Sequence, residues 1–494
     1  MSAHPSPSGD SPRAARGVAA SLIAVIAVTL GVRLVAGASL HLTEDEAYYR
    51  LWSMAPAFGY YDHPPMIAWW IWLGRHMIGD TALGVRLLPI LACAASTILV
   101  VDLARLAGAG AATSTRAGVW FNAMLLVAAG GFLAVPDAPA ALFWTATLWC
   151  AVKAERASSM AWWLAAGAAA GLAALSKYSA LFLAPGILVW LAWTPGGRAA
   201  LRRPGPWLAA VFALLVFGLN VAWNASHHWL TFIKQFGRIA PGQLAPRYLI
   251  EFIFTQALLL NPLIAAFVVR AFARRGSSAG LAPFVATSAP FIAYLLIHSL
   301  HDRVQAHWPA PVYPALAIIA AMGAETVAGA PSWARLRTAA PVFGLGVCAA
   351  LLVWLALAPG VGGVIDPARP VRGWPAFARS LEALRAQRGA AWIGTESYGL
   401  AAELDDEPGL RAPILQISER ARYQDLATAT PPDLSRPGLI VDLPRRMDLA
   451  ALRQCFTRLQ PLGTLTRGAP REPGTPYAVI LVAGPRRDIL RAGC

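Results

Sequence analysis

The chain has 494 residues, of which 57% are hydrophobic and only 14% are charged. A mean hydropathy of +0.52 excludes a soluble enzyme of ordinary composition. The net charge of +15 is spread in ones, twos and threes between apolar segments, which is typical of membrane topology rather than of nucleic-acid binding. We therefore expect an all-α polytopic membrane protein in contact with a lipid bilayer, without a nucleic-acid partner.

Apolar segments approaching the length of a membrane-spanning helix recur about eleven times. The first follows residues 1–16, a polar stretch that we expect to be disordered and cytoplasmic. The others lie at about 83–104, 117–135, 138–152, 161–176, 179–194, 206–223, 249–270, 280–299, 309–328 and 339–358. Residues 66–79 are apolar but short and contain Arg75 and His76, which predicts an interfacial helix.

Successive segments between the spans lie on alternate sides of the membrane. When the N-terminus is cytoplasmic, every segment on the cytoplasmic side carries basic residues, as the positive-inside rule requires. The odd number of spans then sends the tail, residues 366–494, to the outer side. This tail is richer in Pro, Arg, Asp and Glu, and a helical pattern at 374–387 separates β-like runs. The runs are Ala391–Gly394, Gly438–Asp442 and Tyr477–Ala483. They predict a small α/β domain.

The five cysteines have no CxxC or metal-type spacing, which indicates neither a zinc ribbon nor a disulfide framework. A bridge between Cys455 and Cys494, both in the tail, stays open.

The polar island His41–Pro65 lies on the outer side, between two long apolar segments. Its acids and adjoining histidine are Glu44, Asp45, Glu46, Asp62 and His63. Carboxylates beside a bilayer need water, a partner or a metal, so this cluster indicates a functional site. Thr43 and Glu46 also fit a capping box that starts a short helix and leaves Asp45 free. Both interpretations of the loop stay open.

Three further polar features share the outer side. Asp137 begins a predicted helix, where its simplest role is an N-terminal cap. Lys177 lies between two apolar spans, where its amine either snorkels to the interface or holds a phosphate. The segment His298–Pro309 holds three His, one Asp and one Arg before a helix, which suits an anionic headgroup; a metal is the alternative.

Carboxylates opposite cations at one membrane face fit transfer of a group from a lipid phosphate to an alcohol. The acid removes the acceptor's proton, and the cations stabilise the phosphate that leaves. The chain has no glycine-rich nucleotide motif, so a nucleotide donor is not expected. A transporter or flippase of a lipid-linked anion is the alternative, and it predicts charges at mid-membrane with repeat symmetry. A structural scaffold would not need the acidic cluster.

Five motifs resemble the bacterial branch of glycosyltransferase family 39, which includes protein mannosyltransferases and the lipid A aminoarabinose transferase. They are LTEDEAYYRLWSMAPAFGYYDHPPMIAWW, GDTALGVRLLPIL, VPDAPAALFW, LSKYSALFLAPG and HWPAPVYPAL. The resemblance covers residues 17–330 and implies a GT-C fold. It implies a transmembrane catalytic domain at 17–360, with a first external loop at 38–82, and a periplasmic α/β domain at 366–494. The expected location is the bacterial inner membrane, with the active site facing the periplasm.

The resemblance also implies site residues and partners. Asp45 matches the catalytic aspartate, followed by Glu46. The implied substrate-binding residues are Asp62, His63, Asp137, Lys177, Arg303 and His307. His63 stands where relatives have lysine, so we expect weaker phosphate binding by it at high pH, where histidine is neutral. The donor is a polyprenyl-phosphate-linked sugar, and the acceptor is lipid A, another glycolipid or a protein. A divalent metal at Asp45, Asp62 and His63 stays open, and no other cofactor is expected.

Overall fold

The computed structural model describes residues 12–237, 243–273, 279–327, 329–357, 366–423, 426, 432–468 and 474–494. The chain divides into two compact units. The helical unit comprises Met1–Val35 and Leu88–Leu351, and the mixed unit comprises Ala36–Leu87 and Leu352–Cys494. The mixed unit thus combines the polar island with the C-terminal tail. The predicted boundary between residues 360 and 366 falls largely on 358–365, outside the described residues, so it stays a prediction.

The helical unit is built from helices that follow the predicted apolar spans. Its longest helices are α1 (Pro12–Ser39), α4 (Ala82–Leu106), α11 (Pro204–Ser226) and α17 (Pro331–Leu357), three of which extend into the mixed unit. The others are α5 (Ala111–Ala123), α6 (Leu125–Gly130), α7 (Asp137–Ala157), α8 (Met160–Ala174), α9 (Leu183–Trp193), α10 (Pro195–Leu201), α12 (Leu230–Phe236), α13 (Arg247–Leu259), α14 (Pro262–Ala273), α15 (Ala282–His298) and α16 (Tyr313–Glu325). The predicted disordered N-terminus falls mostly on residues 1–11, outside the described residues.

Fewer helices are long enough to cross a membrane than the sequence predicts. Among the described residues, four helices pass by length and composition, or up to six if each bent pair counts as one span. The remaining apolar helices are shorter or are interrupted. The helical character of the spans is confirmed, but eleven crossings are not.

The span predicted at 249–270 is interrupted, because α13 and α14 are bent by 107° at Leu260–Asn261. Pro262 disfavours helical geometry in the preceding residue. Asn261 takes a positive φ of 70°, and its buried side-chain amide donates hydrogen bonds to the carbonyls of Ala123 and Ala340. The bend is therefore fixed by polar contacts inside the helical unit.

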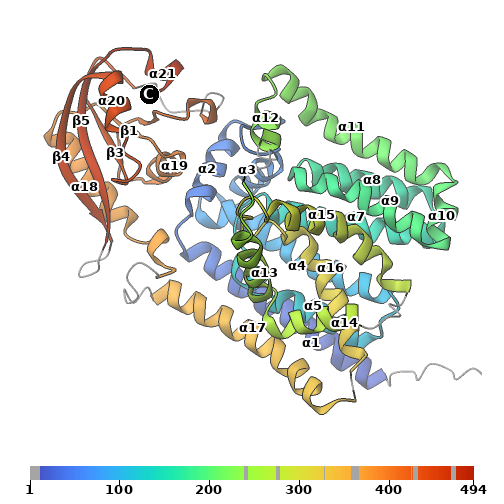
Figure 1. Ribbon diagram of the computed structural model, residues 1–494. Helices are drawn as coiled ribbons and strands as arrows, with labels where there is room; N and C mark the ends of the chain where they lie inside the picture. The colour runs from blue at the N-terminus through green and yellow to red at the C-terminus, as the bar shows by residue number, and fades with distance from the viewer. Residues whose placement is uncertain are drawn as a thin grey trace, which may run out of the picture. The chain divides into compact units, whose positions relative to one another are not determined.

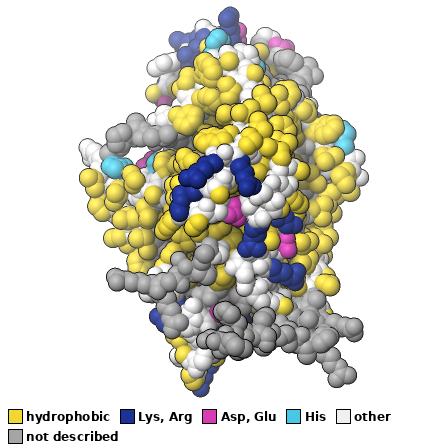
Figure 2. All heavy atoms as spheres, turned by 90° about the vertical axis from the view of Figure 1, so that its right-hand side faces the viewer, with side chains coloured by type: hydrophobic (Ala, Val, Ile, Leu, Met, Phe, Trp, Pro, Cys, Tyr) yellow, Lys and Arg dark blue, Asp and Glu magenta, His cyan; other side chains and the backbone are white. Residues whose placement is uncertain are grey.

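Apolar side chains are widely exposed on the helices of this unit. Figure 2 shows one face of the molecule, where hydrophobic atoms form broad areas around a group of Lys and Arg side chains. On α11 the exposed apolar residues include Trp207, Val211, Leu214 and Leu215. Water-soluble proteins rarely expose apolar areas as broad as these, whereas a surface in contact with lipid does.

The mixed unit contains a five-stranded sheet with the order β2-β1-β3-β5-β4 (Figure 1). Strand β1 pairs in parallel with β2 and β3, and β5 pairs antiparallel with β3 and β4. The strands are β1 (Trp392–Thr395), β2 (Ile414–Gln416), β3 (Gly438–Asp442), β4 (Phe456–Arg467) and β5 (Thr475–Pro485). This confirms the small α/β domain and its three predicted strands. Strands β2 and β4 were not predicted, because β2 has only three residues and β4 is mostly exposed.

Helices of the mixed unit bury two clusters of apolar side chains against this sheet. One cluster contains Trp374, Phe377 and Leu381 of α18, and the other contains Leu452 of α20. The helices of this unit are α2 (Glu44–Met54), α3 (Met66–Ile78), α18 (Trp374–Gln387), α19 (Tyr398–Asp406), α20 (Leu449–Cys455) and α21 (Ile489–Ala492). Helix α18 has the predicted bounds. Helix α3 confirms the short predicted helix, and its interfacial position stays a prediction.

A disulfide joins Cys455, at the end of α20, to Cys494. The predicted possibility of this bridge is therefore confirmed. The two cysteines are 39 residues apart in the sequence, and the segment between them contains β4 and β5.

Replacing both cysteines with alanine should loosen β4 and β5, the strands between them. A cross-link over a loop of this length stabilises a fold by about 4 kcal/mol. We expect faster hydrogen–deuterium exchange in peptides from both strands, measured by mass spectrometry of the full chain in detergent. Cys348→Ala, in the helical unit, is the control and should leave the two strands unchanged. Equal protection in the parent and the double variant would contradict this role of the bridge.

Candidate active site

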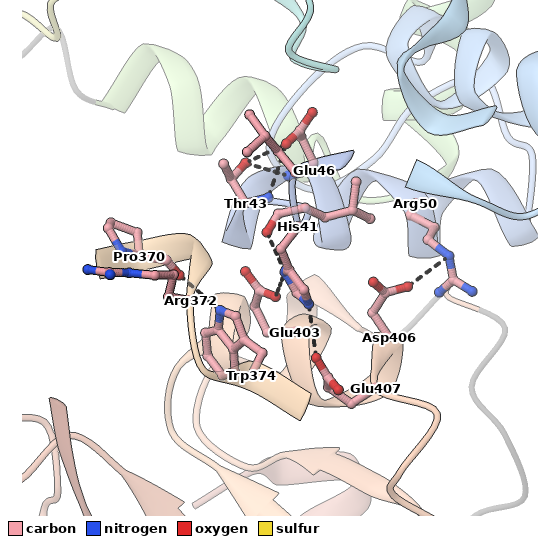
Figure 3. A network of polar contacts seen from close by, with 12 residues as sticks. His41, Thr43, Glu46, Arg50, Pro370, Arg372, Trp374, Glu403, Asp406 and Glu407 are labelled. Atoms are coloured by element: carbon pink, nitrogen blue, oxygen red, sulfur yellow. Dashed lines mark hydrogen bonds and ion pairs between the residues drawn. The ribbon is translucent and has the colours of Figure 1, made fainter. Parts of the chain in front are cut away.

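The start of α2 is fixed by a capping box. The Glu46 backbone amide donates to Thr43 Oγ1 at 3.4 Å, and the Thr43 amide donates to Glu46 Oε2 at 3.0 Å (Figure 3). Arg86 also donates through Nε and Nη2 to the two carboxylate oxygens of Glu46, each at 2.7 Å. Both side chains are fully buried. The predicted capping box is confirmed, and it gives Glu46 a structural role.

Arg86 was not predicted from the sequence as the partner of Glu46. Its guanidinium also donates to the carbonyl oxygens of Gly37, Leu40 and His41, so it fixes the chain that leads into α2. The available signal was an arginine inside a predicted apolar span, where a charged residue normally has a partner.

Asp45 lies in the first turn of α2, as predicted, and is partly exposed. The Tyr398 hydroxyl donates a hydrogen bond to Asp45 Oδ1 at 3.0 Å. Within the part of the chain that the structure describes, no Lys, Arg or His forms an ion pair with Asp45. Tyr398 begins α19, which packs against α2 within the mixed unit (Figure 1). No local pattern in the sequence indicates this contact.

Asp62 is buried and forms an ion pair with Arg422. The Tyr48 hydroxyl lies 3.2 Å from Asp62 Oδ2 and also 3.2 Å from the Arg422 carbonyl oxygen. The Arg422 guanidinium lies over the rings of Tyr61 and Tyr398. Asp62 is therefore neutralised by an arginine from the C-terminal tail, which the sequence did not indicate.

The possible metal ligands do not gather. Among the described residues, no group of three or more His, Cys, Asp or Glu side chains is arranged to hold a metal ion. Asp45 contacts a tyrosine and Asp62 contacts an arginine, while the His63 ring lies against Tyr49. The suggested ligands Asp45, Asp62 and His63, and those of His298–Pro309, are therefore not gathered into a site in the described residues, and a requirement for a divalent metal stays a prediction.

A second polar network joins the polar island to α19 (Figure 3). His41 Nε2 lies 2.9 Å from Glu407 Oε1, and its Nδ1 lies 3.4 Å from Glu403 Oε2. Burial, with the nearby charges of Glu44 and Asp406, raises the pKa of Glu403 well above its usual range. Burial lowers the pKa of His41, but hydrogen bonds to Glu407 and to the Leu42 carbonyl outweigh it and raise that pKa. The hydrogen bond between His41 and Glu407 thus ties the two segments together.

The helical unit brings together three of the predicted substrate-binding residues. Lys177 Nζ lies 2.7 Å from Asp137 Oδ1, and His307 Nε2 lies 3.7 Å from Asp137 Oδ2. Asp137 is the first residue of α7 and Pro136 holds the N-cap position, so Asp137 is not the predicted cap. The buried carboxylate binds Lys177 instead. Arg303 pairs with Glu251 of α13 in an exposed contact.

The chain is similar to known membrane transferases. The family model for dolichyl-phosphate-mannose-protein mannosyltransferase matches residues 62–223. Lipid A galacturonosyltransferase RgtD from Rhizobium johnstonii is 28% identical over 290 residues, which cover 56% of this chain and 59% of that protein. Undecaprenyl phosphate-alpha-4-amino-4-deoxy-L-arabinose arabinosyl transferase from Erwinia tasmaniensis is 27% identical over 316 residues, which cover 60% of this chain and 56% of the relative.

A solved structure extends the likeness to nearly the whole fold. The crystal structure of ArnT from Cupriavidus metallidurans bound to undecaprenyl phosphate superposes with a TM-score of 0.64 at 16% identity. The match covers 94% of this chain and 99% of that one. The chain therefore has the fold of ArnT, which agrees with the expected GT-C fold, and part of its sequence is similar to family 39 glycosyltransferases. The aligned part spans less than two thirds of either curated relative, and the likeness to ArnT concerns the fold alone.

The capping role of Glu46 can be tested by Glu46→Gln. Breaking a buried ion pair leaves Arg86 without a counter-charge, so we expect a loss of about 3 kcal/mol in the free energy of unfolding. Denaturant unfolding of the purified protein in detergent measures the loss. Glu382→Gln is the matched control, because its partly exposed pair with Arg385 on α18 contributes under about 1 kcal/mol. Equal effects of the two substitutions would contradict the assignment.

Proposed function

We propose that this protein is an inverting glycosyltransferase that moves one sugar from a polyprenyl phosphate to an acceptor hydroxyl. The acceptor is lipid A, another glycolipid or a protein. The reaction takes place at the periplasmic face of the bacterial inner membrane. Asp45 is the general base, and cations of the outer face stabilise the phosphate that leaves.

The observation that carries this proposal is the difference between three acids of one loop. Glu46 is held by Arg86, and Asp62 is held by Arg422. Asp45 is partly exposed, and among the described residues its one hydrogen-bonding side chain is the neutral phenol of Tyr398. A carboxylate without a bound cation is available to accept a proton. This favours Asp45 over Glu46 and Asp62.

The proposed reaction is a single displacement. The acceptor oxygen attacks the anomeric carbon of the donor sugar while Asp45 takes the hydroxyl proton. The bond between the anomeric carbon and the phosphate oxygen breaks, and the polyprenyl phosphate leaves with that electron pair. The new glycosidic bond has the opposite configuration at the anomeric carbon. Orientation of the acceptor hydroxyl next to the base lowers the entropic part of the barrier.

Lys177 and His307 are the proposed phosphate contacts of the helical unit. Both face Asp137, which holds Lys177 at 2.7 Å. A lysine fixed in this way is a positioned charge for a phosphate that gains charge as it leaves. Arg303 and His63 are further proposed contacts, and Arg303 would have to exchange its exposed pair with Glu251 for the phosphate. A divalent ion as an additional partner of the phosphate is compatible with this scheme.

The relatives support the substrate class. Those similar in sequence are named for transfer of galacturonic acid to lipid A and for aminoarabinose transfer from undecaprenyl phosphate, and ArnT was crystallised with undecaprenyl phosphate. The disulfide between Cys455 and Cys494 supports the periplasmic side for the tail, because disulfides persist in oxidising compartments.

Asp45→Asn tests the proposed base. The substitution keeps the shape of the side chain and removes its basicity, so transfer should fall by at least about 10²-fold. Transfer of radiolabelled sugar from synthetic polyprenyl phosphate to extracted envelope lipid measures the rate, and donor binding should be nearly unchanged. Asp433→Asn, an exposed acid of the tail, is the control and should keep the parent rate. A parent that translocates the donor without transferring its sugar would favour the flippase alternative.

Lys177→Ala tests the phosphate contact. Loss of one positioned cation from a phosphate in the transition state costs about 3 kcal/mol, so we expect a fall in kcat/KM of roughly 10²-fold. The same transfer assay applies, with donor binding measured separately. Lys153→Ala is the matched control, because Lys153 also faces an acid, Asp102, at 3.5 Å but lies on the predicted cytoplasmic side. Normal turnover of Lys177→Ala would leave snorkelling as the role of this lysine.

A further inference from the structure

We propose that Tyr398, from the C-terminal tail, is a positioning residue for Asp45. Its hydroxyl holds Oδ1 of the carboxylate and leaves Oδ2 to receive the acceptor proton. This inference rests on the proposed function, and it assigns the tail a direct part in the chemistry. The contact lies inside the mixed unit, between α19 and α2.

Tyr398 is fixed on several sides. Its ring lies edge-on to Tyr48 at 4.9 Å between centroids, and the Arg422 guanidinium lies 4.2 Å from its centroid. The Tyr423 hydroxyl donates to the Tyr398 carbonyl oxygen at 2.6 Å. A side chain held in this way presents its hydroxyl to Asp45 in one orientation, which a mobile surface tyrosine cannot do.

The close approach of α19 to α2 is also built into the backbone. Gly399 follows Tyr398, and a Cβ atom at this position would lie 2.7 Å from Glu44 Oε2. Ser397 precedes Tyr398 and caps α19, because its Oγ accepts from the Leu400 amide at 3.4 Å. The three consecutive residues therefore combine a helix start, a hydroxyl donor and a position without a side chain, directly against Glu44 and Asp45.

The direction of the hydrogen bond follows from the surroundings of the phenol. Burial raises the pKa of Tyr398, and the negative charge of Asp45 raises it further, so the hydroxyl keeps its proton and donates. Among the described residues, no side chain or amide donates a hydrogen bond to Oδ2 of Asp45. The charged and titratable groups around this pair are Glu44, Asp62 and Arg422, with Tyr48 and Tyr423 in the same cluster.

A donated hydrogen bond has two separable effects on a base. It restrains rotation of the carboxylate, and it favours the ionised form over the protonated form. Removing the donor should therefore slow transfer and also shift the pH at which the base becomes protonated toward higher values. A residue that only supports the fold would change the amount of active protein without shifting that pH.

Tyr398→Phe removes the donor and keeps the ring in its packing. We expect the acidic limb of kcat/KM against pH to move up by about one pH unit, because a hydrogen bond to a charged group has roughly this effect on its protonation. The maximal rate should fall about tenfold, with donor binding unchanged. Tyr477→Phe is the matched control, since its phenol on β5 contacts Arg467 and not Asp45. The control should leave the limb in place.

A second substitution keeps the test independent of folding. Incorporation of 3-fluorotyrosine at position 398 preserves the hydroxyl and makes it a stronger donor, so the acidic limb should move to lower pH. Opposite shifts for the two changes support positioning by Tyr398. An acidic limb that stays in place for both changes, in protein with parental thermal stability, overturns it.

A readout without turnover separates this proposal from the proposed function. The difference infrared spectrum between the parent and Asp45→Asn reports the carboxyl band of Asp45 as a function of pH. Tyr398→Phe should shift the appearance of that band to higher pH even if the substrate assay shows no sugar transfer. Absence of transfer by the parent would refute the function, and an unshifted band would refute positioning by Tyr398.

Discussion

The buried ion pair between Glu46 and Arg86 is the constraint on which the polar island depends. Two charges in an apolar environment are stable only when each satisfies the other and the remaining hydrogen-bonding groups are occupied. Here the carboxylate also closes the capping box, and the guanidinium also binds three carbonyl oxygens of residues 37–41. One interaction thus fixes the start of α2 and the chain before it, and therefore the direction in which Asp45 leaves the helix.

The acids near α2 lie in different environments, and they therefore differ in their ability to accept a proton. Glu46 and Asp62 each face an arginine, whereas Glu403 is buried beside other acids, which raises its pKa. Carboxylates that lie close together in the sequence or on one helix are therefore not equivalent as bases. The arginine partners remove two candidates and leave Asp45 with a neutral donor, which is compatible with proton acceptance.

Local patterns predicted the elements of this fold well, because capping and hydrophobic periodicity depend on residues close in sequence. Thr43 and Glu46 gave the start of α2, and the pattern at 374–387 gave α18 with its observed bounds. The bend at Asn261 was missed, since it depends on the carbonyls of Ala123 and Ala340 far away in the chain. Asp45 and Asp62 were found from their type and position, but Tyr398 and Arg422 lie more than 300 residues later, and nothing local marks them as partners.

The contacts of Tyr398 and Arg422 give a physical reason for joining the tail to the first loop in one unit. A base on a short loop helix has few neighbours of its own with which to hold its geometry, and precise geometry is what an oriented proton transfer requires. Helix α19 supplies a rigid second surface, with a hydroxyl for Asp45, while the short helix Arg420–Arg422 beyond β2 supplies the cation for Asp62. Any acceptor group that reaches Asp45 Oδ2 must then fit beside the first residues of α19. Under the proposed mechanism, variation at Glu396, Ser397 and Tyr398, which follow β1, changes the surroundings of Asp45 without changing Asp45 itself.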